Sequence, residues 1–138
     1  MASYKISDIK SIGADRAAKL TDMGIATVSQ LLEAGKTKKG RKQLAEQMGE
    51  LASPKLVLNW INRADLFRVP GISSQYSDLL EKAGIDTVKE LAQRNATNLH
   101  AKLSEVNAAK EIVKRIPTQA QVEKWVAAAK ELPRGVEY

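Results

Sequence analysis

The stretch that decides the fold is DIKSIGADRAAKLTDMGIATVSQLL, Asp8–Leu32, because the chain contains a second version of it. Residues 65–92 read DLFRVPGISSQYSDLLEKAGIDTVKELA. Both stretches contain an isoleucine beside one glycine, followed by the pattern Gly-Ile-x-Thr-Val-x-x-Leu. The glycine, however, follows the isoleucine in SIG (11–13) and precedes it in GIS (71–73). The repetition predicts two copies of one structural unit, each built around a tight turn.

The similarity continues beyond these two stretches. QLAEQ (43–47) resembles KLSEV (102–106), and WINRA (60–64) resembles WVAAA (125–129). The spacing grows towards the end of the second copy, which places a small insertion there. We therefore expect one repeat over residues 1–65 and a second over 66–138, packed together as one compact unit.

Helix signals recur at the same places in both copies. Thr27 and Thr87 each stand three residues before a glutamine or a glutamate, the spacing of a capping box, and Thr118 is expected to cap the last helix. Ser53-Pro54 has the serine cap and first-position proline of a helix start. No segment has a strand pattern, and the sequence predicts an all-α fold of eight or more short helices. Four glycines are expected to end helices in a left-handed conformation: Gly24, Gly35, Gly49 and Gly84.

These residues resemble the helix-hairpin-helix motif, in which a short helix leads through a Gly-apolar-Gly turn into a second helix. The resemblance implies two tandem repeats with a SAM/helix-hairpin-helix-like fold. The whole chain further resembles a bacterial domain-of-unknown-function family of tandem helix-hairpin-helix units, through GRKQLAEQ (40–47), LAQRNATNLHAKLSEVN (91–107) and LPRGVEY (132–138). This resemblance covers essentially all 138 residues.

In the helix-hairpin-helix family the turn brings backbone N–H groups to a nucleic-acid phosphate, without reading the bases. The resemblance implies this role for the first turn, Ser11, Ile12 and Gly13, and for the second turn, Gly71, Ile72 and Ser73. Each turn has one serine in place of a glycine. A serine that needed a positive φ would cost about 1 kcal/mol or more, whereas elsewhere it is harmless. Three basic residues accompany the first turn, with Lys10 just ahead of it and Arg16 and Lys19 after it. The second turn has only Arg68 ahead of it.

GKTKKGRK (35–42) is the most basic stretch of the chain. It approaches the P-loop pattern, but Arg41 and Lys42 stand where lysine and a hydroxyl belong, and no strand precedes it. We therefore reject nucleotide binding. A basic loop that opens a helix with Lys38, Lys39, Arg41 and Lys42 would follow a phosphate backbone, and the alternative is a solvated charged loop.

Other kinds of chemistry have little support in the sequence. The chain has no cysteine and one histidine, His100, whose expected role is packing or capping, so we expect no metal site and no cofactor. Trp60 and Trp125 fall on equivalent apolar faces and are expected in the core. Because no nucleophile–base pair stands out, we do not expect an enzyme or a small-molecule substrate. With no apolar run of membrane length and no signal peptide, we expect a soluble cytoplasmic protein without membrane contact.

The leading functional hypothesis is a non-catalytic module that binds the DNA or RNA backbone without sequence specificity. Besides the resemblance, it rests on a net charge of +6, from 22 basic and 16 acidic residues. The alternative is a protein–protein interaction or adaptor module with degenerate turns. The candidate nucleic-acid-binding residues are Ser11, Ile12, Gly13, Arg16, Lys19, Lys38, Lys39, Arg41, Lys42, Gly71, Ile72 and Ser73.

Overall fold

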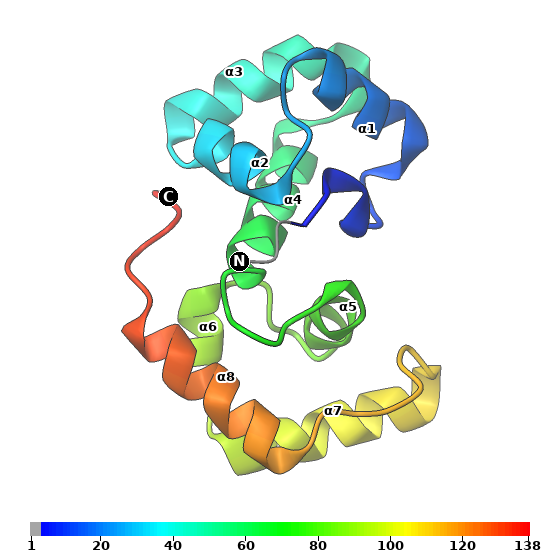
Figure 1. Ribbon diagram of the computed structural model, residues 1–138, viewed down its shortest axis with the longest axis vertical. Helices are drawn as coiled ribbons and strands as arrows, with labels where there is room; N and C mark the ends of the chain where they lie inside the picture. Colours follow the sequence, from blue (N-terminus) through cyan, green and yellow to red (C-terminus); the bar gives the residue numbers. More distant parts are fainter. Residues whose placement is uncertain (1–3) are drawn as a thin grey trace. The chain divides into compact units, whose positions relative to one another are not determined.

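The computed structural model describes residues 4–138, and this part of the chain is helical (Figure 1). It contains eight α-helices and two short 3₁₀ helices, η1 (Ile6–Asp8) and η2 (Gly49–Leu51). Among the described residues the only extended pairing is an isolated bridge between Lys5 and Thr27. The prediction of an all-α fold is therefore confirmed.

The chain divides into two compact units, each described here by itself. The first unit is the described part of Met1–Asp65 together with Arg134–Tyr138, and the second is Leu66–Pro133. The first contains α1 (Gly13–Asp22), α2 (Val28–Gly35), α3 (Lys38–Met48) and nearly all of α4 (Pro54–Leu66). The second contains α5 (Ser74–Lys82), α6 (Val88–Ala92), α7 (Ala96–Lys110) and α8 (Gln119–Glu131). The last five residues, called the tail below, thus lie with the first unit and not with the repeat expected over 66–138.

Side-chain caps fix where the helices begin, as the sequence predicted. The Thr27 hydroxyl accepts a hydrogen bond from the Gln30 N–H at 3.1 Å, and the Gln30 side chain accepts from the Thr27 N–H at 3.1 Å. Thr118 forms the same box at the start of α8. Thr87 accepts from the Glu90 N–H, but the Glu90 carboxylate accepts from the Thr87 hydroxyl instead of from backbone. Each cap satisfies N–H groups that would otherwise lack partners at a helix start.

Gly24, Gly49 and Gly84 have φ values of 88°, 59° and 93° and stand at helix ends, as predicted. Gly35 also stands at a helix end, as the last residue of α2, but its predicted left-handed conformation was wrong because its φ is not positive. A Cβ atom at this position would overlap the Ile61 side chain. Gly35 is therefore explained by the close approach of α2 to α4.

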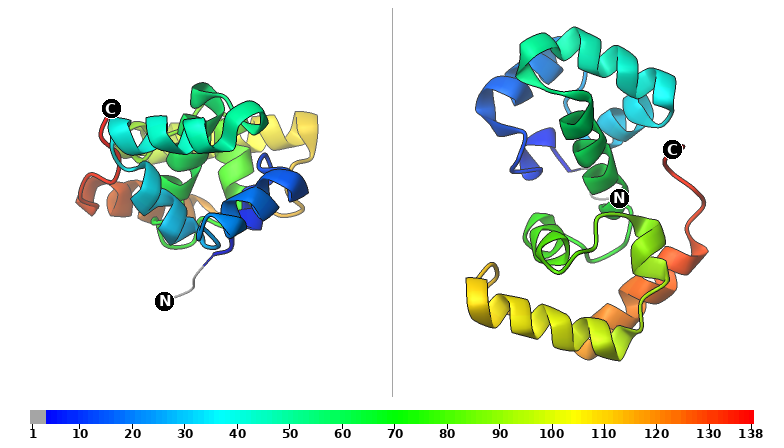
Figure 2. Two further views of the ribbon diagram at one scale, coloured as in Figure 1. Left: turned by 90° about the horizontal axis from the view of Figure 1, so that it is seen from above. Right: turned by 180° about the vertical axis from the view of Figure 1, so that it is seen from behind.

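Apolar side chains fill the centre of each unit, and both tryptophans are buried, as predicted. In the second unit α8 packs along α6 and α7, and Trp125 contacts the Tyr76 ring with centroids 5.3 Å apart. In the first unit α3 packs mainly against α2 and α1, and the view from behind in Figure 2 shows α3 and α4 diverging from the segment that joins them. The largest fully buried side chains of the first unit are Ile9, Ile12, Leu20, Leu31, Trp60 and Ile61.

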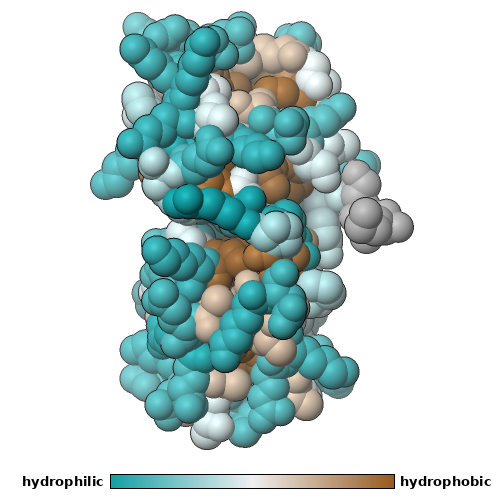
Figure 3. Space-filling view, turned by 90° about the vertical axis from the view of Figure 1, so that its left-hand side faces the viewer, coloured by the Kyte–Doolittle hydropathy of each residue, from teal (hydrophilic) through white to brown (hydrophobic). Residues whose placement is uncertain are grey.

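Hydrophilic side chains dominate the face shown in Figure 3, where apolar residues appear mainly in recesses between them. Among residues 4–138, no helix combines the length and apolar character needed to cross a bilayer.

Candidate functional site

The first turn places its isoleucine inward. Ile12 is fully buried, and its N–H donates to the Ile9 carbonyl at 3.0 Å. Ser11 and Gly13 are exposed, and Gly13 has a φ of 77° where α1 begins. Ser11 is not among the described residues with positive φ. The serine that replaces glycine in this turn therefore bears no backbone strain.

The second turn has a different backbone conformation. Ile72 is again fully buried, but the left-handed residue is Gly71, with a φ of 90°, and Ser73 is extended at the start of α5. A Cβ atom on Gly71 would lie 3.0 Å from the Trp125 indole nitrogen. The glycine changes sides between the two copies because the residue that needs positive φ changes sides. Both turns hold an isoleucine in the core, by different backbone routes.

Arg16 connects the first turn to the segment after α3 through hydrogen bonds from its guanidinium. Its Nε donates to the Leu51 carbonyl at 2.6 Å, and Nη1 lies 3.5 Å from the carbonyl oxygens of Ser11 and Ile12. The side chain is half-buried, whereas Lys19, one turn further along α1, is exposed. Arg16 thus has a structural role, and Lys19 is a cation directed to solvent.

The basic stretch is helical from Lys38 onward, so the expectation of a basic loop was wrong for residues 38–42. The Thr37 hydroxyl accepts from the Gly40 N–H at 3.0 Å and caps α3, which places Lys38, Lys39 and Lys42 on its first turns. A Cβ atom on Gly40 would overlap the Ala34 carbonyl oxygen. Glycine at this position therefore lets α3 start directly against the end of α2.

Arg41 is 9% exposed and thus buried, whereas its lysine neighbours Lys39 and Lys42 are exposed. Nη1 donates to the carbonyls of Gly35 and Lys36, at 2.9 and 3.2 Å, and Nη2 donates to the Glu137 carbonyl at 2.5 Å. One guanidinium thus satisfies carbonyl groups at the end of α2 and holds the tail as well. With these donors occupied inside the first unit, Arg41 contributes to the structure rather than to a free cationic surface.

Further contacts hold the tail against the rest of the first unit. The Glu137 N–H donates to the Lys36 backbone carbonyl at 2.8 Å, and Val136 is buried. The Tyr138 hydroxyl donates to the side-chain Oδ1 of Asn62 at 2.5 Å. The Tyr138 ring also lies 6.0 Å from the Arg41 guanidinium carbon. Sequence reasoning missed the contacts between Arg41 and the tail, because nothing in the basic stretch distinguishes one buried arginine from its exposed lysine neighbours.

Four exposed lysines remain around the start of α3, and we call Lys36, Lys38, Lys39 and Lys42 the lysine patch. Lys38 and Lys42 are one helical turn apart and share a face of α3. No acidic residue occurs between Glu33 and Glu46, although the exposed Glu137 of the tail has its backbone beside Lys36. The patch is therefore a local concentration of mobile positive charge.

The first turn and the lysine patch lie at opposite ends of α3. Arg16 reaches Leu51, just beyond the end of this helix, while the patch surrounds its first residue. At 1.5 Å per residue, Lys42, the patch residue nearest to the end of α3, lies about 9 Å along the axis from Met48. The first turn and the lysine patch are therefore two separate features of the first unit.

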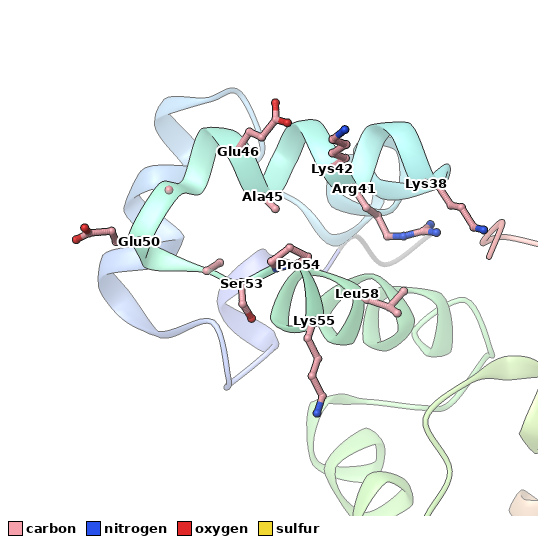
Figure 4. A pocket seen from close by; sticks show the side chains of 12 residues that line it. Lys38, Arg41, Lys42, Ala45, Glu46, Glu50, Ser53, Pro54, Lys55 and Leu58 are labelled. Atoms are coloured by element: carbon pink, nitrogen blue, oxygen red, sulfur yellow. The ribbon is translucent and has the colours of Figure 1, made fainter.

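A groove of about 840 Å³ lies between α3 and α4 in the first unit (Figure 4). Lys38 and Lys42 line it on α3, and Lys55 and Leu58 line it on α4. Sequence reasoning did not find the groove, since it depends on the distance between two helices. The described residues hold no group of three or more His, Asp and Glu side chains arranged to bind a metal ion.

The chain matches the profile of a family described as a domain of unknown function (DUF4332) over residues 10–132. The match covers most of the 138 residues and both units, so the protein belongs to this family. No solved structure matches the chain.

Proposed function

We propose that this protein binds the backbone of nucleic acids without sequence specificity, through the lysine patch on α3. The observation that carries the proposal is the cluster of four exposed lysines with no acidic residue in the sequence between them. Lysine ammonium groups on flexible stems act as point charges, which suits phosphates at variable positions and reads no base.

We further propose that each unit is a helix-hairpin-helix repeat. The support is the shared sequence pattern, the buried isoleucine of each turn and the helix that starts directly after it. Since Ile12 and Ile72 are buried, only backbone N–H groups and the exposed flanks of the turns are open to a ligand. We assign the turns chiefly to positioning helices and assign the main phosphate contacts to α3.

We exclude Arg16 and Arg41 from the proposed phosphate contacts. Arg16 and Arg41 donate to backbone carbonyls within the first unit. Lys19 is exposed on α1 and does not belong to the patch, and the second turn has only Arg68 ahead of it. We therefore expect binding to rest on about three or four phosphate contacts. Such a footprint gives weak affinity that falls steeply with salt.

A comparison of two charge-matched variants tests this proposal. Lys38, Lys39 and Lys42 are replaced by glutamate in one variant, and the exposed Lys89, Lys110 and Lys114 of the second unit in the other. Both variants carry the same net charge. Fluorescence anisotropy with labelled duplexes and single strands of unrelated sequence should show at least about tenfold weaker binding for the patch variant, and a smaller loss for the control.

The same measurement exposes two ways in which the proposal fails. Equal losses in both variants would mean that binding follows net charge and has no site on α3. No binding by the unmodified protein at low salt would eliminate nucleic acid as the ligand.

A further inference from the structure

The groove between α3 and α4 has an apolar floor and charged edges. Ala45 and Ala52 are buried at its base, and Leu58 of α4 is half-buried along one wall. The segment that joins α3 to α4 closes one end, where Gly49 and Ser53 line the groove. Figure 4 shows the groove's charged side chains extending outward from the two helices. The hollow is therefore apolar inside and polar at its rim, like many protein-binding grooves.

The second unit provides an internal comparison. The sequence repeat pairs α3 with α7, through residues 43–47 and 102–106, and α4 with α8, through residues 60–64 and 125–129. In the second unit α7 packs closely along α8, whereas α3 and α4 make few close backbone approaches. The same pair of helices is thus closed in one unit and open in the other. Opening it leaves apolar surface that a compact unit would otherwise bury.

Charge is distributed unevenly along the groove. Lys38 and Lys42 stand on the first turns of α3, while Glu46 and Glu50 lie further along α3 and in η2. Lys55 lies in the first turn of α4, shortly after η2. Arg41 also lines the groove, but its donors are engaged with backbone carbonyls. The groove is therefore positive near the start of α3, whereas both signs of charge are present near the end of α3.

We propose that this groove binds an amphipathic segment of a partner protein, with aliphatic side chains on the floor and carboxylates beside Lys38 and Lys42. The two glutamates disfavour a continuous phosphate backbone along the groove, and its described lining contains no aromatic ring on which a base would stack. Leucine-like side chains fit an aliphatic floor, and spacing of three and four residues presents them on one face of a helix. The partner's acidic end is then fixed by the basic end of the groove.

This inference does not rest on the nucleic-acid proposal, although the two sites share Lys38 and Lys42. Two substitutions separate them. Leu58→Arg blocks the apolar floor and adds positive charge, so it should weaken peptide binding strongly without weakening nucleic-acid binding. Lys39→Glu changes a lysine that belongs to the patch but does not line the groove. It should therefore weaken nucleic-acid binding and leave peptide binding nearly unchanged.

The test uses the full chain and a synthetic helical peptide with leucines three and four residues apart and glutamates at one end. A second peptide has lysines in place of the glutamates. In ¹H–¹⁵N NMR titrations the acidic peptide should shift the amides of Ala45, Gly49 and Leu58 and bind at least about tenfold more tightly than the basic peptide. Leu58→Arg should weaken binding about tenfold or more, and Lys39→Glu less than about twofold.

Three results would overturn the inference. They are equal affinity for the acidic and basic peptides, shifts confined to residues outside α3 and α4, and no shifts with peptide at millimolar concentration. Unchanged binding by a folded Leu58→Arg variant would likewise exclude the groove.

Discussion

Neighbouring residues of one basic run have different roles in this protein. Arg41 is buried and its forked guanidinium donates to three carbonyls, whereas Lys38 and Lys39 extend to solvent. The planar, multiply donating guanidinium suits the buried position, and the compact ammonium group suits the exposed ones. Burial, and not the basic character of the run, decides which residues are available to a ligand.

The lysine patch is predicted to lower the free energy of unfolding of the protein. Lys38 and Lys39 stand in the first turn of α3, where the positive end of the helix dipole disfavours cations. Replacing both by glutamate should raise the free energy of unfolding by about 1–2 kcal/mol and the melting temperature by a few degrees. Thermal unfolding followed by circular dichroism measures this effect.

Lys110 provides the matched control, because it lies in the last turn of α7, where the dipole favours a cation. Lys110→Glu should therefore lower the melting temperature. A lower melting temperature for the double α3 variant would contradict the assigned position of these lysines on the helix.

The two turn glycines should respond differently to alanine. Both have positive φ, so each substitution costs about 1 kcal/mol. At Gly71 the new methyl group also presses on Trp125, while at Gly13 it meets no atom within 4 Å. Urea unfolding should show Gly71→Ala to be the more destabilising substitution. Equal losses would mean that the Trp125 contact is unimportant.

Sequence reasoning anticipated much at the residue scale, including the caps at Thr27 and Thr118 and the buried tryptophans. These features depend on local spacing or on side-chain hydrophobicity, which the sequence contains directly. It misassigned Gly35, since a glycine needed for close packing and one needed for positive φ look the same in a sequence.

At the scale of elements, the junction of α2 and α3 organises the first unit. Gly35 meets Ile61 of α4, Gly40 meets the Ala34 carbonyl, and Arg41 joins the junction to the tail. Two glycines and one arginine thus allow three segments distant in sequence to approach closely. None of these long-range contacts has a local signature, which explains why the sequence predicted a loop here.

Close packing at this junction predicts a coupled pair of substitutions. Gly35→Ala should destabilise the protein by about 1–3 kcal/mol, because the methyl group overlaps Ile61. When Ile61 is already alanine, the added methyl group should cost much less. A double-mutant cycle from urea unfolding should therefore give a coupling energy of about 1 kcal/mol or more. Additive losses would show that the two residues do not compete for space.

The tail is predicted to be a structural part of the first unit. Val136→Asp places a charge at a buried site and should release the tail, lowering the free energy of unfolding by about 1–3 kcal/mol. Hydrogen exchange at the Glu137 amide should accelerate at the same time, because this amide donates to Lys36. Glu137→Gln, which changes only an exposed side chain of the tail, should leave both measurements nearly unchanged. Unaltered exchange in Val136→Asp would contradict the tail's docking.

For the whole molecule, the repeated pattern predicted helical structure throughout but not the connection of the tail. The repeat predicts a single boundary between residues 65 and 66, whereas the last five residues lie with the first unit. LPRGVEY has no helical periodicity. Its partners are the Arg41 guanidinium, the Lys36 backbone carbonyl and the Asn62 side-chain amide, which no sequence pattern marks. The groove between α3 and α4 was equally hidden, because its existence depends on helix separation.

The central claim is that exposed lysines at the start of α3 bind phosphates. Its most direct test is the salt dependence of duplex binding, since the slope of log K against log salt counts phosphate contacts at about 0.9 each. We predict a slope of about −3 for the unmodified protein and the Lys89, Lys110 and Lys114 control, and a slope near zero for the glutamate variant of Lys38, Lys39 and Lys42. An unchanged slope in the patch variant would contradict the claim, and so would an equal loss of slope in the control.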